Sequence, residues 1–167
     1  MKLFKYLTLL ALATLLSIQL SYATSNTSDK QVTLKKPVII SDFEKWGYMI
    51  GKWYGRQSTK EGGTKQELMT RSADGTYVVQ FTVERKDGSK VYQTEAGHWG
   101  ISGNIYFSIY RGWFREGKLI PSDSSNPHNY DAYQILELNN DKFQYKHANS
   151  GNEYIVNKVA PDFKLTK

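Results

Sequence analysis

The strongest constraint on the fold is a regular alternation of extended segments and short turns between about residues 53 and 159. Each turn carries glycine, asparagine or aspartate, the residues that tolerate the backbone angles of tight hairpins. The five clearest turns are 73–75, 86–88, 102–104, 139–141 and 149–151. They separate eight candidate strands: 53–59, 64–72, 76–85, 90–100, 104–114, 130–138, 142–148 and 152–159. No useful stretch of helical periodicity interrupts them, so the chain is predicted to be all-β.

The third candidate strand shows best how these segments would pack. Tyr77, Val79, Phe81 and Val83 alternate with other residues, as expected where one face is buried and the other meets solvent. Sequential antiparallel strands leave exposed edges in an open sheet, whereas closure into a barrel removes them. We therefore predict an eight-stranded antiparallel up-and-down β-barrel, a size that encloses about one small ligand.

The segment before the first strand predicts a short helical turn and a buried tryptophan. Ser41 can cap a helix, and Glu44, three positions on, can complete a capping box. Gly51 then allows a tight backbone turn, and Trp53 can fold beneath the barrel, where its large indole would be buried. Gly51 and Trp53 are therefore predicted to form the closed floor of the barrel.

These residues resemble the lipocalins and the wider calycin group of ligand-binding β-barrels. The likeness rests on Gly51-Lys52-Trp53-Tyr54 after a short helix and on the order of the eight strands, and it covers nearly the whole chain after residue 23. It implies a lipocalin-like barrel with an internal ligand site. The family packs an arginine over the tryptophan of this motif, and Lys158 is the basic residue that this chain offers there.

The chain begins with the pattern of a secretory signal peptide. Lys2 and Lys5 precede an apolar run over 7–16, and small residues stand at the cleavage positions of 21–23. The apolar run is too short to span a bilayer, which takes about 20 residues. We divide the chain into a signal peptide (1–23), a flexible N-terminal arm (24–36), the barrel (37–160) and a C-terminal tail (161–167). The leader predicts an exported protein of bacterial type, periplasmic or secreted, with no stable membrane anchor after cleavage. The chain contains no cysteine, so it forms no disulfide.

Two registers of the early hairpins remain open. If 87–88 is a two-residue turn, Tyr92 and His98 point into the barrel. If the turns are three-residue loops with a glycine bulge, the pairing moves by one residue and the other face turns inward. The residues that would then point inward are Glu67, Met69, Arg71, Gln93 and Glu95. We favour the two-residue register, because it keeps unpaired charges out of the interior.

The predicted ligand-binding residues combine apolar walls with a few polar groups. They are Phe81, Tyr92, His98, Phe107, Gln134, Tyr145, His147 and Tyr154. This mixture predicts an exported binding protein for a small apolar or aromatic ligand. His98 and His147 could bind a metal or haem iron from opposite strands, or each could bond a tyrosine, and no carboxylate is clearly placed to complete a metal site. We therefore predict no metal, no cofactor and no catalytic residue.

Two other functions remain open from the sequence. An isomerase or hydrolase could use a histidine or glutamate in the same cavity, with Glu67 and Glu95 as acid–base candidates in the alternative register. A barrel filled by its own side chains could instead bind a protein through an outer aromatic face. Tyr106 and Tyr110 of the fifth strand indicate such a covered face, either beneath residues 37–40 or in a homodimer through that strand. The net charge of +6 is spread along the chain, so nucleic-acid binding is not expected.

Overall fold

The computed structural model describes residues 40–165, so the predicted signal peptide and N-terminal arm lie outside the described residues. Within this range the chain forms one α-helix, one short 3-10 helix and nine strands. They are α1 (Asp42–Met49), β1 (Gly51–Ser58), β2 (Thr64–Arg71), β3 (Thr76–Glu84), β4 (Lys90–Ser102), β5 (Ile105–Arg115), β6 (Lys118–Pro121), η1 (Pro127–Asn129), β7 (Tyr130–Leu138), β8 (Lys142–His147) and β9 (Glu153–Val159). Over residues 40–165, no helix is both long enough and apolar enough to cross a membrane.

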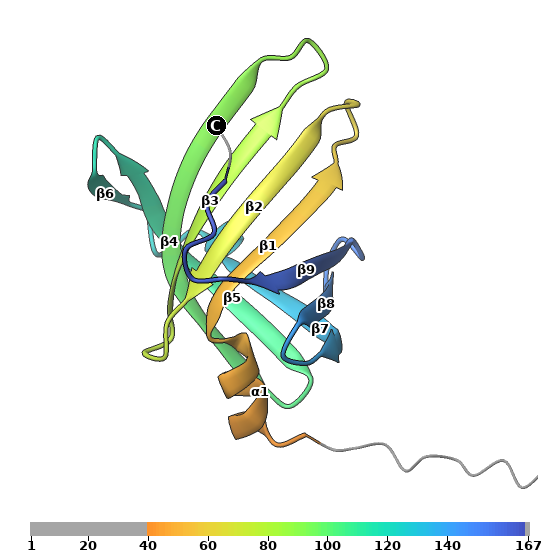
Figure 1. Cartoon of the computed structure of the whole chain (residues 1–167). Coiled ribbons are helices and arrows are strands. Elements are labelled where there is room, and N and C mark those ends of the chain that lie inside the picture. The colour runs from red at the N-terminus through yellow and green to blue at the C-terminus, as the bar shows by residue number, and fades with distance from the viewer. Residues whose placement is uncertain (1–39, 166–167) are drawn as a thin grey trace, which may run out of the picture. The chain divides into compact units, whose positions relative to one another are not determined.

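Eight of these strands close into a barrel (Figure 1). Neighbouring strands pair antiparallel in the order β1–β2–β3–β4–β5–β7–β8–β9, and β9 pairs again with β1. The ninth strand, β6, pairs with the part of β5 that extends beyond β7. The predicted all-β, eight-stranded, lipocalin-like barrel is therefore confirmed. The sequence pattern did not predict β6, whose four residues are too few to show an alternation.

Helix α1 covers one end of the barrel, at the bottom of Figure 1. Its predicted capping box is confirmed, since the Ser41 hydroxyl accepts from the Glu44 amide at 3.2 Å and the Ser41 amide donates to the Glu44 carboxylate at 3.0 Å. The helix is held to the β4–β5 turn by the Lys45 ammonium, which donates to the Gly103 carbonyl at 2.6 Å. Trp46 stacks on Trp99 of β4 with ring centres 4.2 Å apart. This end is therefore closed by packed side chains.

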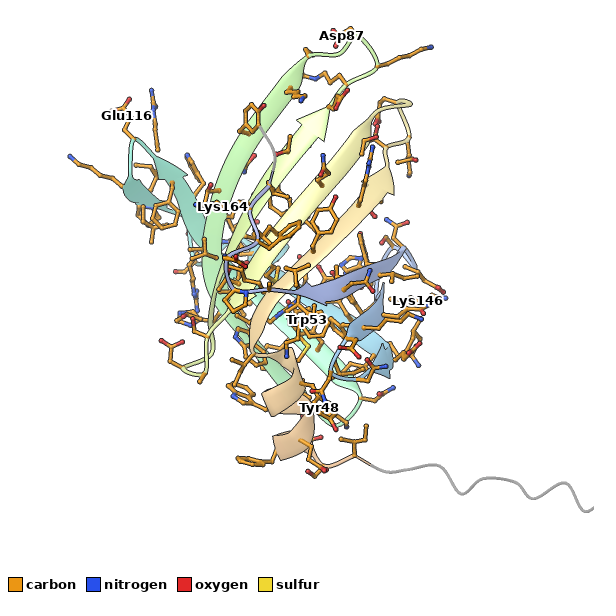
Figure 2. The ribbon with its side chains drawn as sticks, viewed as in Figure 1. Tyr48, Trp53, Asp87, Glu116, Lys146 and Lys164 are labelled. Carbon is orange, nitrogen blue, oxygen red and sulfur yellow. The ribbon has the colours of Figure 1, made fainter. Side chains whose placement is uncertain are left out.

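Trp53 lies just inside this closed end. It is fully buried, and its indole N–H donates to the Met49 carbonyl of α1 at 2.8 Å. The Lys158 ammonium lies 5.2 Å from the Trp53 ring centre and donates to the Tyr48 carbonyl at 2.8 Å, as the lipocalin resemblance implied. Figure 2 shows Tyr48 and Trp53 near this end, with Asp87 of the β3–β4 turn at the opposite end.

The favoured register of the early hairpins is wrong, and the alternative is correct. In the β3–β4 turn the Arg85 amide donates to the Ser89 carbonyl, and Gly88 has a φ of 81°, so three residues form the loop. Val79 therefore lies opposite Glu95, and the same kind of loop joins β2 to β3. The residues that take inward positions are Glu67, Met69, Arg71, Gln93 and Glu95. Tyr92 and His98 consequently lie on the outer face, where both are exposed.

Two later registers also differ from the prediction. The turn after β4 contains residues 103–104, so Gly100 lies opposite Phe107 and the half-exposed Phe107 faces outward. Tyr106 and Tyr110 face the interior instead of a covered outer surface, and a homodimer through β5 stays a prediction. Between β7 and β8, Leu138 lies opposite Phe143, and the register then shifts past residue 136. Tyr133 therefore pairs with His147, and the predicted ligand residue Gln134 is exposed on the outside.

The barrel is closed unevenly where β1 meets β9. β1 pairs with β2 along all eight of its residues, from Gly51 opposite Arg71 to Ser58 opposite Thr64. It pairs with β9 only from Lys52 to Tyr54, opposite Val159 to Asn157. Beyond this short seam the two strands diverge, as Figure 1 shows.

Candidate functional site

A cavity of about 210 Å³ lies inside the barrel, beyond the packed floor. Side chains from β2, β3, β4, β5, β7, β8 and β9 reach it, because the inward positions of each strand follow every second residue. Six tyrosines line it: Tyr77, Tyr106, Tyr110, Tyr133, Tyr145 and Tyr154. Met69, Val79, Phe81 and Ser108 complete the uncharged part of the wall. The cavity is therefore aromatic, with hydroxyl groups available as hydrogen-bond partners.

The tyrosine rings pack against one another and so form a rigid wall. Tyr106 stacks on Tyr133 with ring centres 5.3 Å apart, and Tyr145 stacks on Tyr154 at the same separation. Tyr133 and Tyr145 meet edge to face at 5.2 Å. Burial raises the pKa of Tyr77, Tyr133 and Tyr145 above the ordinary value. These hydroxyls therefore keep their protons at neutral pH.

Four charged side chains also line the cavity, and three of them are acidic: Glu67, Glu95 and Asp131, against Lys65. The Lys65 ammonium lies 4.1 Å from the Phe81 ring centre and 3.8 Å from the Glu67 carboxylate. Glu67 also accepts from the Tyr145 hydroxyl at 3.4 Å. At neutral pH the lining therefore carries more negative than positive charge.

Glu95 differs from the other two acids because no ion pair holds it among the described residues. Its carboxylate accepts from the Gln93 amide group at 2.6 Å. Desolvation by burial raises the pKa of Glu95, while the positive charge of Lys65 acts in the opposite direction. A cation bound beside Glu95 would compensate for this desolvation.

Arg71 is buried on the floor side of the cavity, although it does not line it. Its Nη2 donates to the Tyr106 hydroxyl at 3.2 Å, and the guanidinium lies 5.0 Å from the Tyr106 ring centre and 5.6 Å from that of Phe143. Nε and Nη1 are buried without a hydrogen-bond partner among residues 40–165. Arg71 forms no ion pair with Glu67 or Glu95, although the register brings all three to the inner face.

His98 and His147, which the favoured register directs into the barrel together, lie on opposite faces of the barrel wall. His98 lies opposite Thr76 on the outer face. His147 is on the inner face, where its Nε2 lies 3.1 Å from the Asp131 carboxylate and its Nδ1 lies 2.8 Å from the Ser150 hydroxyl. Within the described part of the chain, neither histidine is hydrogen-bonded to a tyrosine, and no group of three or more His, Cys, Asp or Glu side chains could hold a metal ion.

Of the predicted ligand-binding residues, Phe81, Tyr145 and Tyr154 line the cavity, and His147 lies on the same face beside Tyr133. Glu67, Glu95 and Lys65 are absent from the predicted ligand site, because the two-residue register directs the wrong faces of β2 and β4 inward. Asp131 is absent because the register shift past residue 136 reverses the inward face of β7. One signal could have found them. In the sequences Asp74-Gly75-Thr76 and Asp87-Gly88-Ser89, the aspartate accepts from the amide two residues on, which stabilises the bulged loop.

No protein-family model matches the chain, and no curated protein does either. Among solved structures, the crystal structure of a lipocalin-like protein from Bacteroides uniformis ATCC 8492 is similar to it. That protein is 16% identical, and the match covers 68% of this chain and 100% of the other, with a TM-score of 0.41. This likeness is too distant to transfer a function. On the order and pairing of its own strands, the chain folds as an eight-stranded, lipocalin-like β-barrel.

Proposed function

We propose that this protein binds a small aromatic molecule with a positively charged amine inside the barrel. The observation that carries the proposal is the cavity of about 210 Å³, lined by six tyrosines and by three carboxylates against one lysine. The leader over 1–23 supports export, so the ligand would be met in the periplasm or outside the cell.

The volume limits the ligand to about one ring. Pockets for drug-sized ligands measure about 300–1,000 Å³, which is more than this cavity offers. An apolar cavity of about 150 Å³ holds one benzene molecule. A space of about 210 Å³ therefore suits a single ring with a short substituent.

The lining favours a cation over a neutral or anionic ligand. Aromatic rings attract cations through their faces, by about 2 kcal/mol when the pair is desolvated. Lys65 already adopts this arrangement, with its ammonium over Phe81 and beside Glu67. Glu95 offers a second carboxylate, half-buried and without an ion pair among the described residues. A ligand amine near Glu95 would therefore gain both aromatic and ionic contacts.

The proposal can be tested with three probes of similar size, namely 2-phenylethylammonium, 2-phenylethanol and phenylacetate. In isothermal titration calorimetry at neutral pH, the cation should bind most tightly, the alcohol less tightly and the anion least tightly. Glu95→Gln should weaken binding of the cation by about tenfold, equivalent to about 1.4 kcal/mol, and leave binding of the alcohol unchanged. Glu137→Gln is the matched control, because Glu137 pairs with Lys142 on the surface at 2.7 Å. Tighter binding of the anion, or no binding of any probe, would contradict the proposal.

A further inference from the structure

The seam between β1 and β9 leaves two strand edges facing each other without pairing. Beyond Tyr54 and Asn157, residues 55–58 of β1 and 153–156 of β9 form no ladder with one another. Each strand remains paired on its other edge, β1 with β2 and β9 with β8. An unpaired edge presents a row of main-chain N–H and C=O groups that can accept an added strand.

A second hollow of about 200 Å³ lies in this opening, between Gly55-Arg56-Gln57 of β1 and residues 153–155 of β9. It shares three lining residues with the central cavity: Lys65, Glu67 and Tyr154. The two spaces are thus neighbours on either side of these three side chains. A ligand seated in the cavity could extend sideways into the opening if these side chains move.

Gly55 keeps the base of the opening free of a side chain. A Cβ atom at this position would lie 2.9 Å from Val156 Cγ1 and 3.3 Å from Glu67 Cγ. A larger residue would therefore press against Val156 of β9, whereas Glu67 would need to move by only a few tenths of an ångström. Gly55 does not line the central cavity, so a substitution there can fill the opening without replacing any residue of the cavity wall.

We propose that the site continues through the seam and that its ligand is a short peptide with a free N-terminus. This inference rests on the function proposed above. The N-terminal ammonium and first aromatic side chain occupy the central cavity, and the following amides pair with the free edges of β1 and β9. An extended chain advances about 3.3 Å per residue, as the strands do, so the four unpaired residues of each strand can pair with up to about four residues of an extended peptide. Main-chain pairing supplies the affinity, as in other cases of strand addition.

The first test compares three probes on the unaltered protein by calorimetry. They are 2-phenylethylammonium, the peptide amide Phe-Gly-Gly-NH₂, and the same peptide with both glycine nitrogens methylated. The first probe is the head group of the peptide without its amide chain. The unmethylated peptide should bind at least about tenfold more tightly than the head group, and methylation should remove that gain, because it removes N–H donors.

The second test fills the opening with the double variant Gly55→Val and Val156→Ala, in which the smaller residue relieves the 2.9 Å contact. This variant should bind 2-phenylethylammonium as the unaltered protein does and lose the additional affinity for the peptide. If the variant does not fold, the methylated peptide still decides the question.

The outcomes separate the two proposals. If the head group binds and the peptide gains nothing, or if methylation has no effect, the extension through the seam is wrong and the cavity site stands. If neither the head group nor the peptide binds, the function proposed for the cavity fails as well.

Discussion

Replacing Arg71 by methionine should leave the protein as stable as before or make it more stable. Two buried donors of Arg71 have no partner among the described residues, and each costs about 1–3 kcal/mol, or about 2–6 kcal/mol together. The charged hydrogen bond to Tyr106 offsets about 1.5–3 kcal/mol, and the ring contacts about 2 kcal/mol. Methionine fills a similar space and gains sulfur–aromatic contacts of about 0.3–1.5 kcal/mol. At the middle of these ranges the two opposing sums nearly cancel, so with the methionine contacts the free energy of unfolding should change by about +0.7 kcal/mol.

Urea unfolding followed by tryptophan fluorescence measures this change. The matched control is Lys158→Met, which removes a cation whose ammonium is satisfied by the Tyr48 carbonyl at 2.8 Å. The free energy of unfolding of that variant should fall by about 1–3 kcal/mol, because the Tyr48 carbonyl loses its donor. If Arg71→Met instead lost more than about 2 kcal/mol, the reasoning about its unsatisfied donors would be refuted. Removal of this positive charge should also strengthen binding of 2-phenylethylammonium in the cavity.

Three further outcomes are expected. Because the raised pKa of Glu95 lets the folded state hold a proton more readily than the unfolded state, stability should fall as pH rises from about 4.5 through that pKa. Melting temperatures over this range should fall less for Glu95→Gln. Gly97→Ala should lower the free energy of unfolding in urea by about 3 kcal/mol, since its Cβ would clash with the Ile109 carbonyl and lie 2.7 Å from the Tyr77 ring. Gly103→Ala should lower it by only about 1 kcal/mol, because of its φ of 58°. Trp46→Ala should lose about 2 kcal/mol by removing the stack on Trp99, measured in the same way.

The fold was predictable because its signals are local. Turn residues mark the strand ends, and Ser41 and Glu44 make the capping box that their spacing indicates. The order of the strands then follows from short connections between sequential antiparallel neighbours. The strand β6 could not be predicted, because it pairs with the part of β5 that β7, beginning at Tyr130 opposite Ile109, leaves unpaired.

The candidate site was harder to predict because it depends on the lengths of the turns. An Asp-Gly pair suits both a two-residue and a three-residue loop, and the choice between them reverses both faces of a strand. Keeping unpaired charge out of the interior favours the two-residue loops, and with them the wrong face of β2 and β4. The interior accommodates Glu67 beside Lys65 and Glu95 beside Gln93, so the cost of burying these groups is partly met by their neighbours. The inward positions of Tyr145 and Tyr154 are predicted correctly, and the two residues lie opposite one another on β8 and β9.

The three residue pairs that join β1 to β9 connect the two ends of the barrel's chain. Contacts between residues so distant in sequence form late in folding, because the entropy of closing the loop must be lost before they can form. The seam should therefore be largely absent from the transition state. Interactions absent from a transition state slow unfolding and leave the folding rate almost unchanged. A molecule that bridges β1 and β9 would thus lengthen the lifetime of the folded barrel without hastening its formation.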